Sequence, residues 1–363
     1  MNISRISLRQ FRNLEPTELI PIGGFNVFWG NNAQGKTNLL EGIHLLGSLK
    51  SFRGARNDEL IQHGETTCRL AAEIENRGVR RQVELSIGPQ GKAARVDGKE
   101  VRRPADFFGH LRPVLFSPEE VTLLRGGPAG RRGLLDRAVF QADLTFLDRA
   151  REYDRCLRQR NRLLREGRGA DQLAPWTEAL VSAGARLRLD RGRYLDRLLP
   201  LLQKAHRQIA GGEEEVDISY RRGTEADLID SLRGELERAK QREKMLGQTL
   251  VGPHRDDLEF CLLGRSLRLF ASQGQLRSFL LAFKTAQIED LQNITGVPPV
   301  LLLDDMTSEL DRCRQNYFFS YLRARQGQVF ITTTDIEPLL AHGISTARYF
   351  RVEKGTLHHD RDE

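Results

Sequence analysis

Cysteine and long hydrophobic runs are the two features that this sequence has least of. Its 363 residues include four cysteines, and none of them lies in a Cys-x-x-Cys pair. Zinc sites usually use such paired spacing, so the sequence argues against a zinc site and for a reducing compartment. No apolar run approaches the roughly 18 residues of a membrane-spanning helix, and the N-terminus lacks the apolar core of a signal peptide. We therefore expect a cytoplasmic protein with no membrane association.

Charge and length bound the remaining possibilities. Lys plus Arg is 56 and Asp plus Glu is 49, so the formal net charge is 56 − 49 = +7. With 39% hydrophobic and 29% charged residues, the chain is not a disordered one. The basic excess is modest, but clustering of arginine matters more for nucleic-acid binding than the sum does. At roughly 150 residues per domain, the length predicts two domains or one with a large insertion.

The periodicity of apolar residues changes twice along the chain. Alternating patterns predict strands over most of the first hundred residues, with hairpin turns at Arg77-Gly78 and Asp97-Gly98. Helical spacing then predicts two long helices that form an antiparallel hairpin, the second kinked or restarted at Pro200. We expect an α/β domain split in sequence, residues 1–117 and 245–363, with an α-helical arm domain, residues 118–244, inserted in it.

A Gly-x-x-x-x-Gly-Lys-Thr motif follows an apolar strand and opens a helix, which is the context that a phosphate-binding loop requires. Its glycines let the loop wrap around phosphates, while backbone N–H groups and the helix N-terminus supply positive potential. Lys36 is predicted to reach the β- and γ-phosphates of ATP, and Thr37 to ligate Mg²⁺. A chance glycine-rich turn is the weaker alternative. The predicted ATP-binding residues of this segment are Gly30, Asn31, Asn32, Ala33, Gln34, Gly35, Lys36, Thr37 and Asn38.

An apolar strand that ends in two acids, residues 300–305, supplies the second half of such a site. Asp304 is predicted to hold Mg²⁺ and Asp305 to activate the attacking water, with Asp305 and Lys36 as the catalytic residues. Successive strand side chains face opposite ways, so the chain must turn between the two acids. The alternative is a buried strand that ends in an acidic turn, with Asp305 as a cap. The separation from the loop, 304 − 36 = 268 residues, again requires a large insertion.

A Ser-x-Gly-Gln turn lies 304 − 272 = 32 residues before the acidic pair and precedes an apolar, helix-compatible stretch. Taken alone, Ser272, Gly274 and Gln275 are better explained as a helix cap. In this order and spacing they resemble the signature motif of ABC-type ATPases, which contacts the γ-phosphate held by the other subunit. Residues 308–311 resemble the D-loop of those enzymes, and residues 329–335 resemble their switch strand, with Thr334 where many members have His.

Three further segments extend the resemblance over nearly the whole chain. They are Phe11-Arg12-Asn13-Leu14, Phe116-Ser117-Pro118-Glu119 and Gly252-Pro253-His254-Arg255-Asp256-Asp257. With the motifs above, they make the chain similar to the RecF family of bacterial recombination mediator ATPases, relatives of the SMC and break-repair ABC ATPases. The resemblance implies ATP and Mg²⁺ as cofactors, with Arg12 near the phosphates. No clear Q-loop glutamine is present.

The family resemblance also implies a role and partners. It implies a DNA-dependent ATPase with slow turnover that forms an ATP-dependent, head-to-tail homodimer on duplex DNA, a gap or a single-strand/double-strand junction. It implies RecR as a partner and, with RecO, the loading of RecA in recombinational gap repair. Within the 252–257 segment, His254 and Asp256 form either a metal or acid/base pair or a structural turn, and the turn is favoured.

Eleven arginines fall within 38 residues and form the candidate DNA surface. No base-reading motif is present, so we expect recognition of the DNA backbone or of a junction. The alternative is a solvated helix face, since nearby acids offset part of the charge. A second basic candidate comprises Lys50, Arg53 and Arg56. The eleven are Arg131, Arg132, Arg137, Arg149, Arg151, Arg155, Arg158, Arg160, Arg162, Arg165 and Arg168.

Two other classes of protein remain alternatives. One is another ABC-type ATPase subunit, either an SMC-like DNA clamp or a transport ATPase. The other is a DNA clamp without catalysis, which the intact Lys36, Thr37, Asp304 and Asp305 disfavour.

Overall fold

The computed structural model describes residues 1–212, 214–306 and 310–359. The chain divides into two compact units, Met1–Glu119 with Leu291–Glu363 (unit 1) and Glu120–Asp290 (unit 2). The first junction lies within two residues of the expected boundary at 117/118. The second lies 291 − 245 = 46 residues after the expected boundary at 244/245. Residues 245–290, which we expected in the ATPase domain, thus make most of their contacts in unit 2, and helix α9 (Gln273–Thr295) runs across the junction.

A mostly parallel sheet forms one layer of unit 1 and has the strand order β15-β14-β3-β13-β12-β8. All neighbouring pairs are parallel except β14 and β15, which form an antiparallel hairpin. The central strands β12 and β13 are buried along their whole length, as their continuous apolar sequences predict. The strands are β3 (Phe25–Trp29), β8 (Pro113–Phe116), β12 (Val300–Asp304), β13 (Val329–Thr333), β14 (Arg348–Glu353) and β15 (Thr356–His359).

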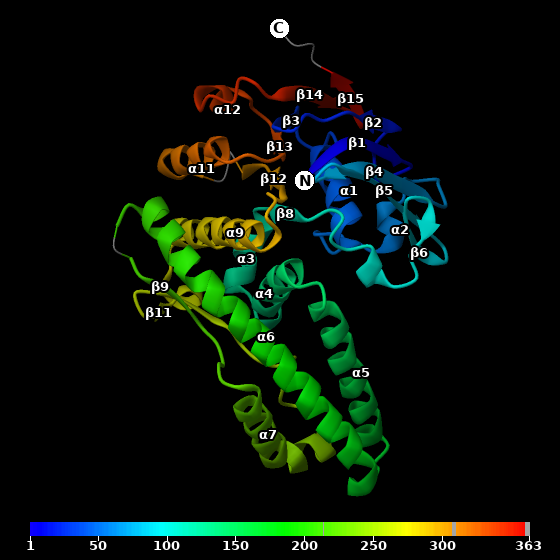
Figure 1. The fold of residues 1–363 in the computed structure, drawn as a ribbon, viewed down its shortest axis with the longest axis vertical. Helices are drawn as coiled ribbons and strands as arrows, with labels where there is room; N and C mark the ends of the chain where they lie inside the picture. The colour runs from blue at the N-terminus through cyan, green and yellow to red at the C-terminus, as the bar shows by residue number, and fades with distance from the viewer. Residues whose placement is uncertain (213, 307–309, 360–363) are drawn as a thin grey trace. The chain divides into compact units, whose positions relative to one another are not determined.

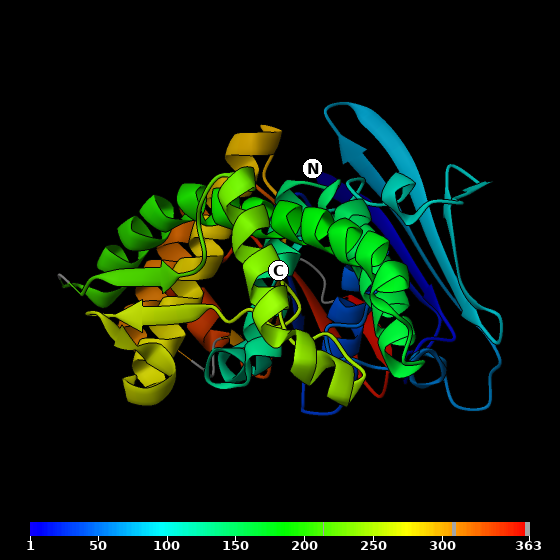
Figure 2. The same ribbon diagram turned by 90° about the horizontal axis from the view of Figure 1, so that it is seen from below.

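A second, antiparallel sheet of unit 1 has the order β2-β1-β4-β5-β6-β7. Its strands alternate, so that Ile6 and Leu8 of β1 are buried while Arg5 and Arg9 face solvent. The predicted turns at Arg77-Gly78 and Asp97-Gly98 join β4 to β5 and β6 to β7, and all four of these residues have positive φ. The strands are β1 (Asn2–Arg9), β2 (Thr17–Leu19), β4 (Cys68–Asn76), β5 (Val79–Gly88), β6 (Gly91–Val96) and β7 (Lys99–Glu100). Figure 2 shows the long hairpin of β4 and β5.

Helix α1 (Lys36–Ser48) packs against both sheets of unit 1 and carries the hydrophobic core between them. Its Leu40 and Ile43 are buried with side chains from β1, β4 and β12. Helices α11 (Arg312–Ala324) and α12 (Glu337–Ala341) follow β12 and β13, and Phe318 of α11 packs on Phe116 of β8. The shorter elements are α2 (Asn57–Leu60) and a 3-10 turn (Pro104–Asp106). The core thus fixes the start of α1, where the nucleotide loop lies.

Unit 2 is mainly helical. Helices α5 and α6 lie side by side in Figure 1 and form the predicted helical hairpin. The expectation that the second helix restarts at Pro200 is wrong, because α6 runs unbroken as one helix over 41 residues. The helices are α3 (Glu119–Arg125), α4 (Pro128–Ala142), α5 (Phe146–Arg165), α6 (Ala170–Ala210), α7 (Glu225–Leu246), α8 (Leu267–Phe270) and α9. A small three-stranded sheet has the strand order β11 (Arg265–Ser266), β10 (Glu259–Leu262), β9 (Val216–Ser219).

None of the helices in the described part of the chain combines the length and the apolar character needed to cross a bilayer.

Candidate nucleotide-binding site

The glycine-rich loop connects β3 to α1 at the carboxyl edge of the parallel sheet. Gly30 has φ 145° and Gly35 has φ 111°, in the region where glycine is favoured. A Cβ atom at Gly30 would lie 2.5 Å from the carbonyl oxygen of Val352, and one at Gly35 would lie 2.8 Å from Cδ2 of Leu14. Both glycines are therefore required by the close approach of neighbouring segments as well as by the turn.

The Lys36 side chain folds back onto this loop. Its Nζ donates hydrogen bonds to the carbonyl oxygens of Gly30 at 2.6 Å and Asn31 at 2.7 Å. Burial lowers the pKa of Lys36, and the charges of Asp305 and Asp304 partly oppose that shift. The ammonium group is thus held in the loop that would receive the phosphates, next to two carboxylates.

Thr37 and Asp304 meet at the start of α1. The Thr37 hydroxyl donates to Oδ1 of Asp304 at 2.9 Å, and the Thr332 hydroxyl donates to the same oxygen at 2.8 Å. Burial raises the pKa of Asp304, the two hydroxyl hydrogen bonds lower it, and nearby Glu119 and Asp305 raise it again. A hydroxyl and a carboxylate oxygen side by side match the oxygen ligands that Mg²⁺ takes from proteins, one or two at a time, beside substrate phosphates.

Asp305 stands where the chain leaves the strand. Strand β12 ends at Asp304, and Asp305 has φ 47°, so the expected turn between the two acids is confirmed. The backbone N–H of Asp305 donates to the Thr332 hydroxyl at 3.0 Å. Thr332 therefore contacts both acids and fixes the turn that separates them.

Arg12, which the family resemblance places near the phosphates, is engaged in an ion pair. Its guanidinium donates to both carboxylate oxygens of Glu41, at 2.9 and 3.0 Å, and to the carbonyl oxygen of Glu59 at 2.8 Å. Glu41 lies on α1, four residues after Thr37, and its side chain is fully buried. Such bidentate pairs are the strong class of ion pair. In this structure Arg12 thus fixes α1 to the segment that follows β1.

The Ser-x-Gly-Gln turn lies in unit 2, where it caps α9. Ser272 Oγ accepts from the backbone N–H of Gln275 at 3.2 Å, and Gln275 Oε1 accepts from the N–H of Ser272 at 3.0 Å. This reciprocal pattern is a capping box. Gln275 Nε2 also reaches Oε1 of Glu214 at 3.3 Å, and Gly274 lies in the first turn of the helix. The helix-cap interpretation thus has a structural basis, and it leaves the Ser272 side chain exposed.

Two motifs remain, the D-loop segment at residues 308–311 and the switch strand at residues 329–335, and the structure describes the first only in part. Ser308 and Glu309 of the D-loop segment lie outside the described residues, while Asp311 caps α11 by accepting from the N–H of Arg314 at 3.0 Å. Thr334 follows β13 and is exposed.

The 252–257 segment is a structural junction of unit 2. Buried Asp256 accepts from Arg188 at 2.7 and 3.0 Å and from Tyr220 at 2.9 Å. His254 Nδ1 lies 2.6 Å from the Tyr153 hydroxyl, and its Nε2 lies 3.3 Å from the carbonyl oxygen of Thr249. Both ring nitrogens are therefore in use. These hydrogen bonds hold both side chains within unit 2 and support the interpretation as a structural turn.

The eleven clustered arginines do not form one surface. Arg131 and Arg160 are buried and form ion pairs with Asp257 and Glu243, both at 2.6 Å. The prediction that they contact DNA is therefore wrong, and their role is structural. Three others also contact acidic residues of unit 2. Arg132 donates to the backbone carbonyl oxygen of Asp256, and Arg137 pairs with Glu120. Arg149 pairs with Asp143 and Asp190. Arg168 pairs with Glu166 at the end of α5.

The five that remain lie along one exposed face of α5, at spacings of four and three residues. They are Arg151, Arg155, Arg158, Arg162 and Arg165.

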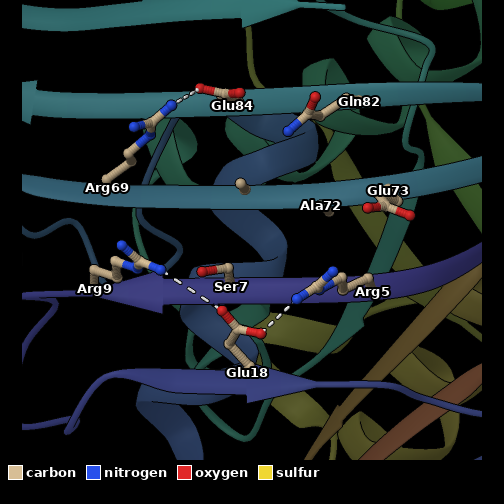
Figure 3. A pocket seen from close by; sticks show the side chains of 10 residues that line it. Arg5, Ser7, Arg9, Glu18, Arg69, Ala72, Glu73, Gln82 and Glu84 are labelled. Carbon is tan, nitrogen blue, oxygen red and sulfur yellow. Dashed lines mark hydrogen bonds and ion pairs between the residues drawn. The ribbon is translucent and has the colours of Figure 1, made fainter.

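A separate hollow of about 240 Å³ lies on the solvent face of the antiparallel sheet, away from the loop motifs. Figure 3 shows small Ser7 between Arg9 and Arg5, both of which reach Glu18. The ion pairs measure 2.6 Å for Arg5 and 3.6 Å for Arg9. Because these charges are mutually compensated, the hollow carries no evident ligand chemistry.

Sequence reasoning missed two residues of the site, Glu41 and Thr332, and the contacts of Gln34 with the β14–β15 turn. Glu41 had a signal, because it is a charged residue within the apolar stripe of α1 and therefore needs a partner. Thr332 and the contacts of Gln34 had none, since they depend on which strands become neighbours in the sheet.

The fold and the site define a P-loop ATPase of the ABC type, whose two nucleotide-binding segments are separated by a helical insertion. The family described as "RecF/RecN/SMC N terminal domain" matches residues 2–357, and the chain belongs to it.

Curated relatives share nearly the full length. The chain is 52% identical over 359 residues to "DNA replication and repair protein RecF" of Syntrophotalea carbinolica, covering 98% of this chain and 99% of that protein. It is 46% identical to the protein of the same name from Geobacter sulfurreducens, again over 98% and 99%. The resemblance to the RecF family is thereby confirmed.

Solved structures of related proteins have the same fold. "Structure of the recombination mediator protein RecF-ATPrS in RecFOR pathway" matches with TM-score 0.90 and 31% identity, covering 99% of this chain and 98% of that one. An SMC head bound to a winged-helix domain of ScpA matches with TM-score 0.57 at 13% identity, covering 98% and 96%, which supports the fold alone.

Proposed function

We propose that the protein is an ATP-dependent DNA-binding ATPase of recombinational gap repair. The observation that carries the proposal is the pairing of Thr37 with Asp304, which joins the phosphate loop to the acidic strand end. A relative of 30% identity over 99% of both chains is described as "RecF-ATP", and curated relatives are named for DNA replication and repair.

The residues take distinct parts in nucleotide binding. The loop residues Gly30 to Asn38 would surround the phosphates of ATP, with Lys36 as the point charge that contacts them. Thr37 and Asp304 would hold Mg²⁺, which supplies charge neutralisation at the phosphates when bound. Asp305, at the turn after β12, would orient the attacking water and accept its proton. In the same proposal Arg12 acts near the phosphates by holding the start of α1 through Glu41.

A second copy of the chain would complete the site. Ser272, Gly274 and Gln275 present a hydroxyl and backbone N–H groups at the N-terminus of a 23-residue helix, a suitable receptor for an anion. The family resemblance assigns that anion as the γ-phosphate bound by the partner copy. ATP would thus drive a head-to-tail homodimer, and slow hydrolysis would reset it.

The exposed arginine face of α5 is the surface that we propose for DNA. Its 4-3-4-3 spacing places five guanidinium groups along one line. Three of them make surface ion pairs with acids three or four residues away, and such pairs contribute little to stability. Arg155 and Arg165 make no ion pair with the described residues. A row of cations without base-reading chemistry suits phosphate contacts.

The partners are proposed from the family resemblance, and the location is proposed from the sequence. We propose that the protein acts in the cytoplasm with RecR and RecO in loading RecA on DNA. We also keep the domain assignment in which residues 245–363 complete the ATPase domain, since the signature turn and the acidic strand both fall there.

An ATPase assay with and without duplex DNA tests the proposal. We expect slow hydrolysis that rises with DNA. Hydrolysis indifferent to DNA would favour another ABC-type ATPase, and binding of ATP without hydrolysis would favour a non-catalytic clamp.

A further inference from the structure

The turn of the β14–β15 hairpin contacts the phosphate loop at one residue, Gln34. The backbone N–H of Lys354 donates to Oε1 of Gln34 at 2.6 Å, and the N–H of Gly355 donates to the carbonyl oxygen of Gln34 at 3.0 Å. Lys354 and Gly355 have φ values of 47° and 80°, which turn both N–H groups away from the hairpin's own ladder. Two donors of one turn thus converge on one residue of the loop.

Gln34 carries this contact into the loop itself. Its Nε2 donates to the carbonyl oxygen of Asn32 at 3.3 Å, so the side chain spans from the hairpin to the loop backbone. Between Asn32 and Gln34, Ala33 has φ 62°, a left-handed conformation that costs free energy for a residue other than glycine. At the other end of the loop, the carbonyl oxygen of Val352 would lie 2.5 Å from a Cβ atom on Gly30. The hairpin therefore restrains the loop at both ends.

The same turn also fixes the segment after β1. The carbonyl oxygen of Gly355 accepts from the N–H of Glu15 at 3.0 Å, and a Cβ at Gly355 would lie 2.0 Å from the carbonyl oxygen of Asn13. Asn13 Oδ1 in turn accepts from Nδ2 of Asn38, in the first turn of α1, at 2.7 Å. Three segments distant in sequence are thus joined around the loop by hydrogen bonds and close packing.

We propose that Gln34 is a positioning residue, which holds the phosphate loop in its binding conformation by accepting the Lys354 N–H, and that the β14–β15 turn is therefore coupled to nucleotide binding. This inference rests on the proposed function, because it assumes that the loop binds ATP. A loop ordered before binding loses less conformational freedom when ATP arrives. By linkage, a nucleotide that orders the loop also orders the turn.

The test compares Gln34→Met, which keeps side-chain length and removes the acceptor, with Gln10→Met as a matched control. Gln10 makes one side-chain hydrogen bond, to Glu65 at 2.7 Å, in the same unit. A fluorescent ATP analogue gives affinity, and hydrogen exchange of the Lys354 and Gly355 amides reports the turn. Gln34→Met removes the hydrogen bonds to Lys354 and Asn32, so we expect affinity about five- to tenfold weaker, the change that one or two hydrogen bonds give.

Hydrogen exchange separates positioning from general stability. In the wild type and in Gln10→Met, nucleotide should slow exchange at both amides, and in Gln34→Met the response of the Lys354 amide should be lost. Unchanged affinity in Gln34→Met, or an equal response of the turn to nucleotide, would overturn the inference. Gln34→Asn, whose amide is one methylene too short to reach Lys354, repeats the comparison if Gln34→Met does not fold. Failure of the wild type to bind nucleotide would instead refute the proposed function.

Discussion

Thr37 Oγ1 lies 2.9 Å from Asp304 Oδ1, although 267 residues separate the two in the chain. Strands β3, β13 and β12 are neighbours in one parallel sheet, so their carboxyl ends meet at one edge. The helix that begins at Lys36 starts from that edge. The insertion between the two motifs therefore leaves their contact intact, and this contact decides where Mg²⁺ would bind.

Asp304→Asn should separate metal binding from stability. Burial raises the pKa of Asp304 above its ordinary value of 3.8. The native state therefore loses stability as pH rises from 3.8 through the raised pKa, and above that pKa the ionised carboxylate carries the full cost of its burial. A neutral Asn removes the cost, so the Tm without nucleotide should rise at neutral pH.

The gain should shrink as pH falls, because the wild-type carboxyl then becomes protonated. Mg²⁺ with ATP should stabilise the wild type and not the variant. Thermal unfolding at several pH values, with and without Mg²⁺-ATP, measures both effects. Equal stabilisation of the two proteins by Mg²⁺-ATP would remove Asp304 from the metal site.

Lys36→Met should abolish ATP binding. The Lys36 ammonium is held at the loop by two carbonyl oxygens, those of Gly30 and Asn31. We expect at least a hundredfold loss of affinity, since hydrogen bonds to a charged group contribute about 1.5–3 kcal/mol each. Lys36→Arg should bind ATP but hydrolyse it poorly, because the planar guanidinium differs in shape from an ammonium. Hydrolysis at the wild-type rate by Lys36→Met would refute the site.

Ser272→Arg should act only between copies. The Ser272 side chain is exposed, so a bulky cation there leaves the loop of its own chain intact and blocks a partner's approach. We expect normal ATP affinity in the monomer and loss of the ATP-dependent dimer. Because Ser272 also caps α9, Ser272→Asn, which keeps a cap acceptor, serves as the control for helix stability. Dimerisation of Ser272→Arg at wild-type concentration would count against the composite site.

Replacing Arg155 and Arg165 together by Ala should weaken DNA binding and flatten its salt dependence. Each lost phosphate contact lowers the slope of log affinity against log salt by about 0.9, so the pair should lower it by about two. The charge-matched control replaces Arg5 and Arg80, both exposed on the antiparallel sheet of unit 1. An equal effect of the two pairs on the slope would assign the result to net charge instead of to the α5 face.

The strand, loop and helix around Lys36 could be predicted from local motifs, because they are contiguous in sequence. The turn at Asp305 followed from the alternation of strand side chains. The Arg12–Glu41 pair could not be predicted, since it depends on how α1 packs beside the segment after β1. Buried Arg160 could have been separated from exposed Arg158 by helical periodicity, because it shares a face with Tyr153 and Leu164. The second unit boundary gave no signal, as it falls inside the continuous helix α9.

The central claim is that ATP, bound at Lys36 and Thr37, joins two copies until Asp305 supports hydrolysis. Asp305→Asn keeps the size and hydrogen bonding of the side chain but removes its base, so it should bind ATP and fail to hydrolyse it. Light scattering of this variant with Mg²⁺-ATP measures the claim directly. The account predicts the mass of two chains with ATP, of one chain without it, and a dimer retained on DNA. An ATP-bound Asp305→Asn protein with the mass of one chain, or one that hydrolyses ATP at the wild-type rate, would contradict it.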